Sequence, residues 1–235
     1  MKYIHKGAAP RELQGWINGQ PFENERHTNC TYDDMPGDVK DVIRQRLLEE
    51  QGWLCCYTGV RMAASSSHIE HLKPQSRCQE YEDVDYANLL AAYPGDKVRC
   101  EFGAKAKDDW YDEQLLVSPL HLRCETQFQF DQFGRIRSAN DGDLAAQQTI
   151  RRLRLDHESL TEMRGQAIDE ALFPKHRRIS EAQLRTVIES FCSRNDAKHP
   201  FRSFCFVVVQ AARELLLKAQ REHRRRQAIR SQSHR

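Results

Sequence analysis

The chain has 235 residues and a formal net charge of +2, with 39% hydrophobic and 30% charged residues. This length allows one sizeable core or two small ones. No apolar run approaches the ~20 residues that a membrane-spanning helix needs, and the first residues lack the apolar segment of a secretory signal. Composition therefore predicts a cytoplasmic globular protein and excludes a membrane-embedded one.

The first half of the chain alternates between irregular and ordered segments. Pro and Gly residues predict an irregular segment over residues 1–37, and Asp38 is the expected N-cap of a helix that ends before Gly52. Residues 53–72 are expected to form a hairpin with a turn at Thr58-Gly59 and a return into His68–His71. The further expected segments are a polar loop at 73–87, renewed order at 88–92 and a short helix within 100–108.

The second half is expected to be mainly helical. A turn at Asp131–Gly134 between Phe130 and Ile136 predicts one more pair of strands. The expected helices are Leu144–Leu155, one that begins with a capping box at Ser159 and ends near Phe173, one that begins with a capping box at Ser180, and Phe201–Arg226. The valine run of the last helix could also support a strand. The predicted fold class is α+β, a small ββα unit embedded in a mainly α-helical protein.

The predicted parts are an N-terminal segment and helix at 1–50, a core at 51–140, and a helical region at 141–235 with a basic tail. From Ala219 to the end the chain carries a charge of +5. Such a tail suits phosphate backbones, but it also suits the end of a solvated helix, and the sequence favours neither.

The eight cysteines do not indicate a metal cluster. Without a secretory signal they should be thiols or metal ligands rather than disulfides. No C-x-x-C pair occurs, and Thr58 stands where a knuckle would need a second cysteine after Cys55-Cys56. Since a closed zinc site needs four ligands, we expect buried thiols and no structural zinc.

The segment Ile69–Pro74 carries the most chemical information. Glu70 offers a hard oxygen suited to Mg²⁺ or Mn²⁺, and His71 has a pKa suited to taking a proton from water. Adjacent residues on a regular strand point to opposite faces, so a sharp bend near Pro74 would be needed to aim both at one ion. Asn88 follows 17 positions after His71.

The order C-Y, E-H-x-x-P, N-L-L, C and K resembles the HNH (His-Me finger) nuclease superfamily, in which the histidine activates water. The resemblance implies that His71 is the general base, that Glu70 is a ligand of a single divalent metal ion, and that Asn88 orients His71. The second metal ligand would lie on the following helix, where Glu101 is the best oxygen donor and Cys100 the other candidate. Phosphate contacts are expected from flanking cations, of which Lys73, Lys105 and Lys107 are the strongest candidates, with Lys97 and Arg99 beside them.

Residues 1–170 also resemble PtuB, the HNH component of Septu-type bacterial defence systems, some of which are associated with retrons. The matching residues include Lys6, Pro10 and Leu13, Glu50-Gln51, Ser118-Pro119-Leu120, Cys124-Glu125, Phe130-Asp131 and the run Thr149–Leu155. The resemblance implies an ABC/SMC-like ATPase partner of the PtuA type, and a retron reverse transcriptase with its RNA–DNA as a further partner.

Two alternatives remain open at this stage, a non-catalytic nucleic-acid-binding protein and a zinc-bridged scaffold subunit. His68, on the same strand face as Glu70, could join the site, but we expect a solvated histidine there. The sequence does not choose between DNA and RNA, including tRNA, as the substrate.

Overall fold

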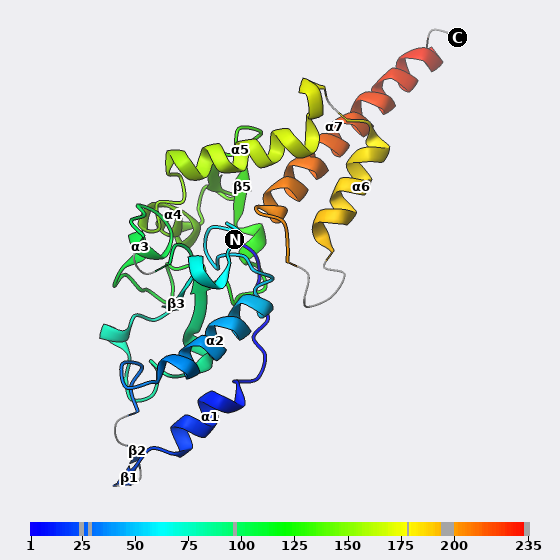
Figure 1. The fold of residues 1–235 in the computed structure, drawn as a ribbon. Helices are drawn as coiled ribbons and strands as arrows, with labels where there is room; N and C mark the ends of the chain where they lie inside the picture. The colour runs from blue at the N-terminus through cyan, green and yellow to red at the C-terminus, as the bar shows by residue number, and fades with distance from the viewer. Residues whose placement is uncertain (24–25, 28–29, 96–97, 178, 194–199, 233–235) are drawn as a thin grey trace.

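The computed structural model describes residues 1–23, 26–27, 30–95, 98–177, 179–193 and 200–232 (Figure 1). The α-helices in these ranges are α1 Arg11–Asn18, α2 Gly37–Glu50, α3 Ala104–Lys107, α4 Leu144–Arg152, α5 Glu158–Leu172, α6 Glu181–Cys192 and α7 Cys205–Gln232. The 3₁₀ turns are Ala64–Ser66, Gln75–Arg77, Tyr86–Asn88, Cys124–Thr126 and Pro174–His176.

The strands of the described ranges form two-stranded antiparallel sheets. The pairs are β1 Phe22–Glu23 with β2 Arg26–His27, β3 His68–His71 with β4 Leu89–Ala92, and β5 Phe128–Phe130 with β6 Ile136–Ser138. Helices and small sheets are thus mixed along the chain, which is the α+β class predicted from the sequence. In the described residues, no helix combines the length and the apolar character needed to cross a bilayer.

The sheet of β3 and β4 lies against α2. All four residues of β4 are buried, as are Ile43, Leu47 and Leu48 of α2, and α2 contacts β4 directly. The side-chain amide of Gln51 joins the two elements, because it donates to the Ala91 carbonyl at 2.8 Å and accepts from the Ala91 N–H at 2.7 Å. The end of α2 is therefore fixed to the strand beside β3.

The predicted hairpin of residues 53–72 is wrong in its pairing. The turn at Thr58-Gly59 exists, and it closes locally through the bond from Cys55 N to the Val60 carbonyl at 2.8 Å. The strand His68–His71, however, pairs with β4, His71 opposite Leu89. Ser65–Ser67 lies in or beside a 3₁₀ turn, where Ser66 Oγ accepts from Ala63 N. Serine hydroxyls that bond nearby backbone favour a turn over a strand, so the return is interrupted before β3.

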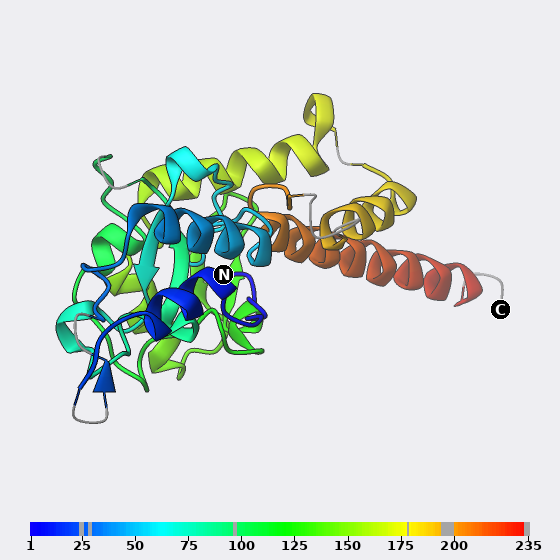
Figure 2. The same cartoon turned by 60° about the horizontal axis from the view of Figure 1, so that its bottom comes forward.

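The helical half packs against the sheet of β5 and β6. Gln210 of α7 links the elements, because its side chain accepts from Phe130 N at 2.9 Å and donates to the Phe128 carbonyl at 3.2 Å. The buried residues Val207 and Val208 lie where α7 contacts α5, α6 and β5. A helix covered on several sides can be apolar all round, which explains why the valine run is helical. Figures 1 and 2 show α6 along the first part of α7.

Several helix starts differ from the sequence predictions. Pro36 is the N-cap of α2, and Asp38 lies in the first turn. His157, not Ser159, caps α5 by accepting from Ser159 N. The capping box at Ser180 is confirmed. The segment 1–37, expected to be irregular, contains α1, whose Leu13, Trp16 and Ile17 keep the helical spacing that Gly15 obscures.

Candidate active site

Glu70 and His71 are neighbours at the end of β3 and have different contacts. The Glu70 carboxylate has three neighbours: Tyr57 Oη donates to its Oε1 at 3.2 Å, Lys107 Nζ lies 2.9 Å from Oε1, and His68 Nε2 lies 3.6 Å from Oε2. The side chain of Glu70 is 12% exposed. The ammonium of Lys107, the imidazole of His68 and the hydroxyl of Tyr57 therefore surround this carboxylate.

These neighbours keep Glu70 ionised despite its burial. Burial by itself raises the pKa of the Glu70 carboxyl, but hydrogen bonds and charges from His68 and Lys107 outweigh it, so the pKa lies below its ordinary value. His68 responds in the opposite sense. Burial lowers the pKa of its imidazole, and the contacts with Glu70 and the Pro94 carbonyl raise it by more. Glu70 is therefore ionised, and its carboxylate lies next to the imidazole of His68 on the same face of β3.

Lys107 is a buried partner of Glu70. Its residue exposure is 2%, and its Nζ also donates to the His71 carbonyl at 3.0 Å. The one-turn helix α3 directs it inward, since Gly103 before α3 has φ +69° and donates its N–H to the Leu153 carbonyl. The sequence predicted a phosphate contact for Lys107, and in this structure Glu70 and the backbone of β3 occupy its ammonium instead.

His71 is held through one ring nitrogen. Its Nε2 lies 2.8 Å from the Asp83 carbonyl oxygen, and its ring is nearly perpendicular to that of Tyr32, with the centroids 4.6 Å apart. A carbonyl only accepts, so in the neutral ring Nε2 carries the hydrogen and Nδ1 keeps a lone pair. Burial lowers the pKa of the His71 imidazole. Within the described part of the chain no hydrogen bond to Nδ1 is found, so this atom can accept a proton.

Asn88 acts on the loop rather than on the ring of His71. Its Oδ1 accepts from Lys73 N at 2.8 Å, and its Nδ2 donates to the carbonyls of Lys73 and Glu82, each at 3.0 Å. Residue 82 precedes Asp83, whose carbonyl bonds His71. Asn88 therefore fixes both ends of the 73–82 segment, and any orienting effect on His71 passes through this backbone.

The remaining predicted site residues lie apart from Glu70 or are paired elsewhere. The Glu101 side chain is 70% exposed and bonds Arg154 at 3.2 Å and His157 at 3.4 Å, neither of which contacts Glu70. The side chain of Lys73 pairs with Glu82, while Lys105 is exposed on α3. Cys100 is partly buried, Arg99 is exposed, and Lys97 lies outside the described residues. Glu101 as a metal ligand stays a prediction.

Sequence reasoning missed the role of His68 at this site. It was expected to be solvated, yet it is buried, and its Nδ1 contacts the Pro94 carbonyl. The signal was present in the alternation of β3, which puts residues 68 and 70 on one face. The hydroxyl of Tyr57 and the Asp83 carbonyl could not have been predicted, since the first depends on the local turn at 58–59 and the second is a backbone group.

The donors present fit a divalent ion of the Mg²⁺ or Mn²⁺ class in part. Among the described residues, no group of three or more His, Cys, Asp or Glu side chains is placed to hold a metal. Mg²⁺ is commonly bound by one or two carboxylates together with water and substrate phosphates, so a full protein cage is not required. Glu70 Oε2 is an oxygen donor of the type that Mg²⁺ and Mn²⁺ prefer, and His68 Nε2, 3.6 Å from it, is a softer nitrogen donor. The ammonium of Lys107 competes for the same carboxylate.

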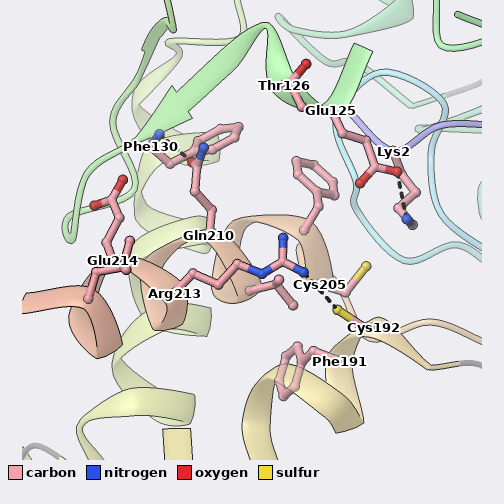
Figure 3. Close-up of a pocket in the computed structure, with 13 residues that line it drawn as sticks. Lys2, Glu125, Thr126, Phe130, Phe191, Cys192, Cys205, Gln210, Arg213 and Glu214 are labelled. Carbon is pink, nitrogen blue, oxygen red and sulfur yellow. Dashed lines mark hydrogen bonds and ion pairs between the residues drawn. The ribbon is translucent and has the colours of Figure 1, made fainter. Parts of the chain in front are cut away.

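A cavity of about 340 Å³ lies elsewhere, between β5 and the helices α6 and α7 (Figure 3). Its labelled polar groups are engaged with neighbours: Lys2 pairs with Glu125 at 2.7 Å, and Arg213 donates to Cys192 Sγ at 3.9 Å. Its lining does not include Glu70 or His71. The cavity is therefore a separate feature of the helical half and not the centre formed at β3.

No protein-family model matches the chain. A curated protein of Vibrio cholerae serotype O1 biovar El Tor, named "Retron Vc95 putative HNH endonuclease", is 27% identical over 132 residues, which cover 54% of this chain and 60% of that protein. The chain thus spans about 60% of the length of this relative. The similarity is weak, and it supports the HNH endonuclease family to which the E-H-x-x-P segment pointed.

Proposed function

We propose that this protein is an HNH endonuclease that hydrolyses phosphodiester bonds of nucleic acid in the presence of Mg²⁺ or Mn²⁺, with His71 as the general base. The observation that carries the proposal is the state of His71 beside Glu70. The Nε2 of its buried ring lies 2.8 Å from the Asp83 carbonyl, and an ionised carboxylate lies on the adjacent residue. The similarity to a retron HNH protein supports the same reaction class.

The reaction begins with proton transfer to His71. Its lowered pKa keeps the ring neutral at pH 7, so Nδ1 can take a proton from a water molecule that attacks phosphorus in line. The Asp83 carbonyl then stabilises the ring, because Nε2–H remains its donor in the protonated form. Asn88 holds the backbone on both sides of this contact, which keeps the base oriented while the proton moves.

The expected metal ion would be held by Glu70, and we propose His68 as the second protein ligand. Such an ion supplies positive charge for the oxygens of the pentavalent phosphorus and for the leaving oxygen. Glu70 must be released in part from Lys107 for this to occur. The freed ammonium would remain beside the site, where a cation also favours a developing negative charge.

We further propose that the protein acts as the effector of an anti-phage defence complex with an ABC/SMC-like ATPase of the PtuA type. The resemblance to PtuB and the retron origin of the similar protein support this assignment. A nuclease that is always active would damage its own host, so a partner that gates it is expected. A retron reverse transcriptase with its RNA–DNA would belong to the same complex.

The partner test uses the full chain. A chain that ends near residue 140 would lack α7, whose buried Val207 and Val208 complete the core on β5, so loss of binding by that form would carry no meaning. Co-purification of the full chain with the product of the neighbouring gene supports the complex. Failure to bind, together with full cleavage by the chain alone, argues against it.

The nuclease proposal is tested on purified full-length protein, with and without the neighbouring gene's product. DNA and RNA pools, including tRNA, are incubated with Mg²⁺, with Mn²⁺ or with EDTA. We expect cleavage that needs the added ion and stops with EDTA. If the protein is instead a non-catalytic nucleic-acid-binding protein or a zinc-bridged scaffold subunit, no cleavage is expected under any of these conditions. The zinc-bridged scaffold would also contain stoichiometric zinc after purification.

A further inference from the structure

The end of α7 extends beyond the body of the molecule. The first part of the helix is anchored, since Val207, Val208 and Ala212 are fully buried. From Arg221 to Arg226 every residue is exposed. Figures 1 and 2 both show this end of α7 passing beyond α6 and pointing away from β3. The exposed part therefore contributes little to the core, and its composition needs another explanation.

Four cations of this part share one side of the helix. At about 100° per residue, Lys218, Arg221, Arg224 and Arg225 fall on an arc of roughly 120°. The partly buried residues of the same segment, Leu215, Leu216, Ala219 and Gln220, fall on the opposite side, where α7 contacts α6. The four cations thus form a stripe that faces solvent, and we call it the α7 basic stripe.

Interactions within the chain do not account for this stripe. In the described ranges, none of its four side chains forms an ion pair with a carboxylate. The favourable effect of a cation on the helix dipole is confined to about the last turn, whereas the stripe ends at Arg225 and α7 continues to Gln232. Glu214 and Glu222 lie three or four residues from Lys218 and Arg225, so they offset part of the repulsion among the four cations. Four cations against these two carboxylates still leave this side of α7 with a net positive charge, which suits an anionic ligand.

We propose that the α7 basic stripe binds the phosphodiester backbone of a double-stranded nucleic acid. Lys218 and Arg225 are separated by about 10 Å along the axis at ~1.5 Å per residue. A duplex carries one phosphate per ~3.4 Å of axis on each strand, so the stripe spans several phosphates. A helix about 10–12 Å across also fits the major groove of B-form DNA, which is about 12 Å wide, whereas the major groove of an RNA duplex is narrow. Arg matches phosphate oxygens in a bidentate manner, which favours this ligand over a point-charge counterion.

The proposal deepens the nuclease assignment, because it adds a contact with the phosphate backbone of the nucleic acid away from the bond that is cleaved. Binding at the stripe does not itself require cleavage. The end of α7 that carries the stripe lies away from β3 (Figure 1), so the stripe would hold a different part of the nucleic acid than the part that reaches His71. Its contacts carry no base specificity. They would raise affinity for any duplex and make that affinity depend on salt.

The test measures binding of full-length protein to a fluorescent DNA duplex of about 30 base pairs, long enough for several helical turns, and to an RNA duplex of the same sequence, in EDTA, across a range of salt concentrations. The stripe variant is K218Q/R221Q/R224Q/R225Q, in which Gln preserves helix propensity. The control variant loses the same charge at exposed arginines elsewhere, R11Q/R123Q/R137Q/R177Q. Thermal unfolding and circular dichroism establish that both variants fold as the wild type does.

We expect the stripe variant to bind about tenfold or more weakly at ~0.1 M salt, with a log–log salt slope reduced by about 0.9 for each DNA phosphate that the variant no longer neutralises. Single changes at Arg221 and Arg225 should each reduce the slope by about 0.9. The duplex that shows the larger change identifies DNA or RNA as the ligand.

An unchanged slope in the folded stripe variant, or an equal reduction of affinity in the control variant, would overturn the proposal. It would equally be overturned if the stripe variant failed to bind a protein partner but bound the duplex as the wild type does. Failure here leaves cleavage by the wild type intact. Conversely, cleavage that persists in His71→Ala removes the nuclease mechanism and leaves the stripe untouched.

Discussion

Replacement of Lys107 by Met should destabilise the protein strongly, because it leaves a buried carboxylate without its cation. Lys107 Nζ lies 2.9 Å from Glu70 Oε1, and the exposed fractions of the two side chains are 1% and 12%. Removal of one partner of a buried ion pair typically costs about 3–5 kcal/mol. Glu70 keeps the hydrogen bond from Tyr57, so we expect about 3 kcal/mol, the lower end of that range.

Urea unfolding measures this destabilisation as a lower midpoint at unchanged slope. Lys105→Met is the matched control, since it removes the same charge from the exposed side of α3 and should change the free energy of unfolding by about 0.5 kcal/mol or less. Adding Glu70→Gln to Lys107→Met should recover roughly 2 kcal/mol, because the unpaired charge is then gone. A cost below about 1 kcal/mol for Lys107→Met, or strict additivity in the double variant, would refute the reasoning.

Three further outcomes follow from the same contacts. Asn88→Ala removes three hydrogen bonds to backbone and should lower the free energy of unfolding by about 2–3 kcal/mol. A change of less than about 0.5 kcal/mol in urea unfolding would contradict the conclusion that Asn88 fixes both ends of the 73–82 segment. Gly134→Ala should lower the melting temperature by several degrees, since its φ is +81° and a Cβ would lie 2.3 Å from the Thr161 carbonyl, whereas Gly142→Ala, with no atom within 4 Å, should not. His68→Ala should weaken Mn²⁺ binding about 10–100-fold in calorimetry, and equal affinity would remove His68 as a ligand.

Residue type and spacing were enough to single out the E-H pair and Asn88 as site candidates, but not to predict what they contact. Their hydrogen bonds depend on loop backbone, namely the Asp83 carbonyl for His71 and the backbone of residues 73 and 82 for Asn88. A single sequence holds no record of which carbonyl a loop will present, so these contacts required the structure.

Charge was the feature that sequence reasoning interpreted least well. Lys107 looked like a surface cation, because lysines are rarely buried without a partner and the partner lies 37 positions earlier in the chain. The partner strand of β3 was predicted wrongly for a similar reason, because that partner also lies far along the chain. The pairing of β3 with β4 follows from the buried faces of α2 and β4 and not from the local turn at 58–59. By contrast, β5, β6 and the long final helix have local signals, and these elements are confirmed.

The most direct test of the account compares cleavage by the wild type, His71→Ala and His5→Ala in Mn²⁺, with thermal unfolding of each. His5 is exposed, so its variant controls for the removal of an imidazole. We predict that His71→Ala folds and loses about 10²–10⁴-fold in cleavage rate, the usual effect of a general base, while His5→Ala cleaves as the wild type does. Wild-type cleavage by a folded His71→Ala protein would contradict the central claim.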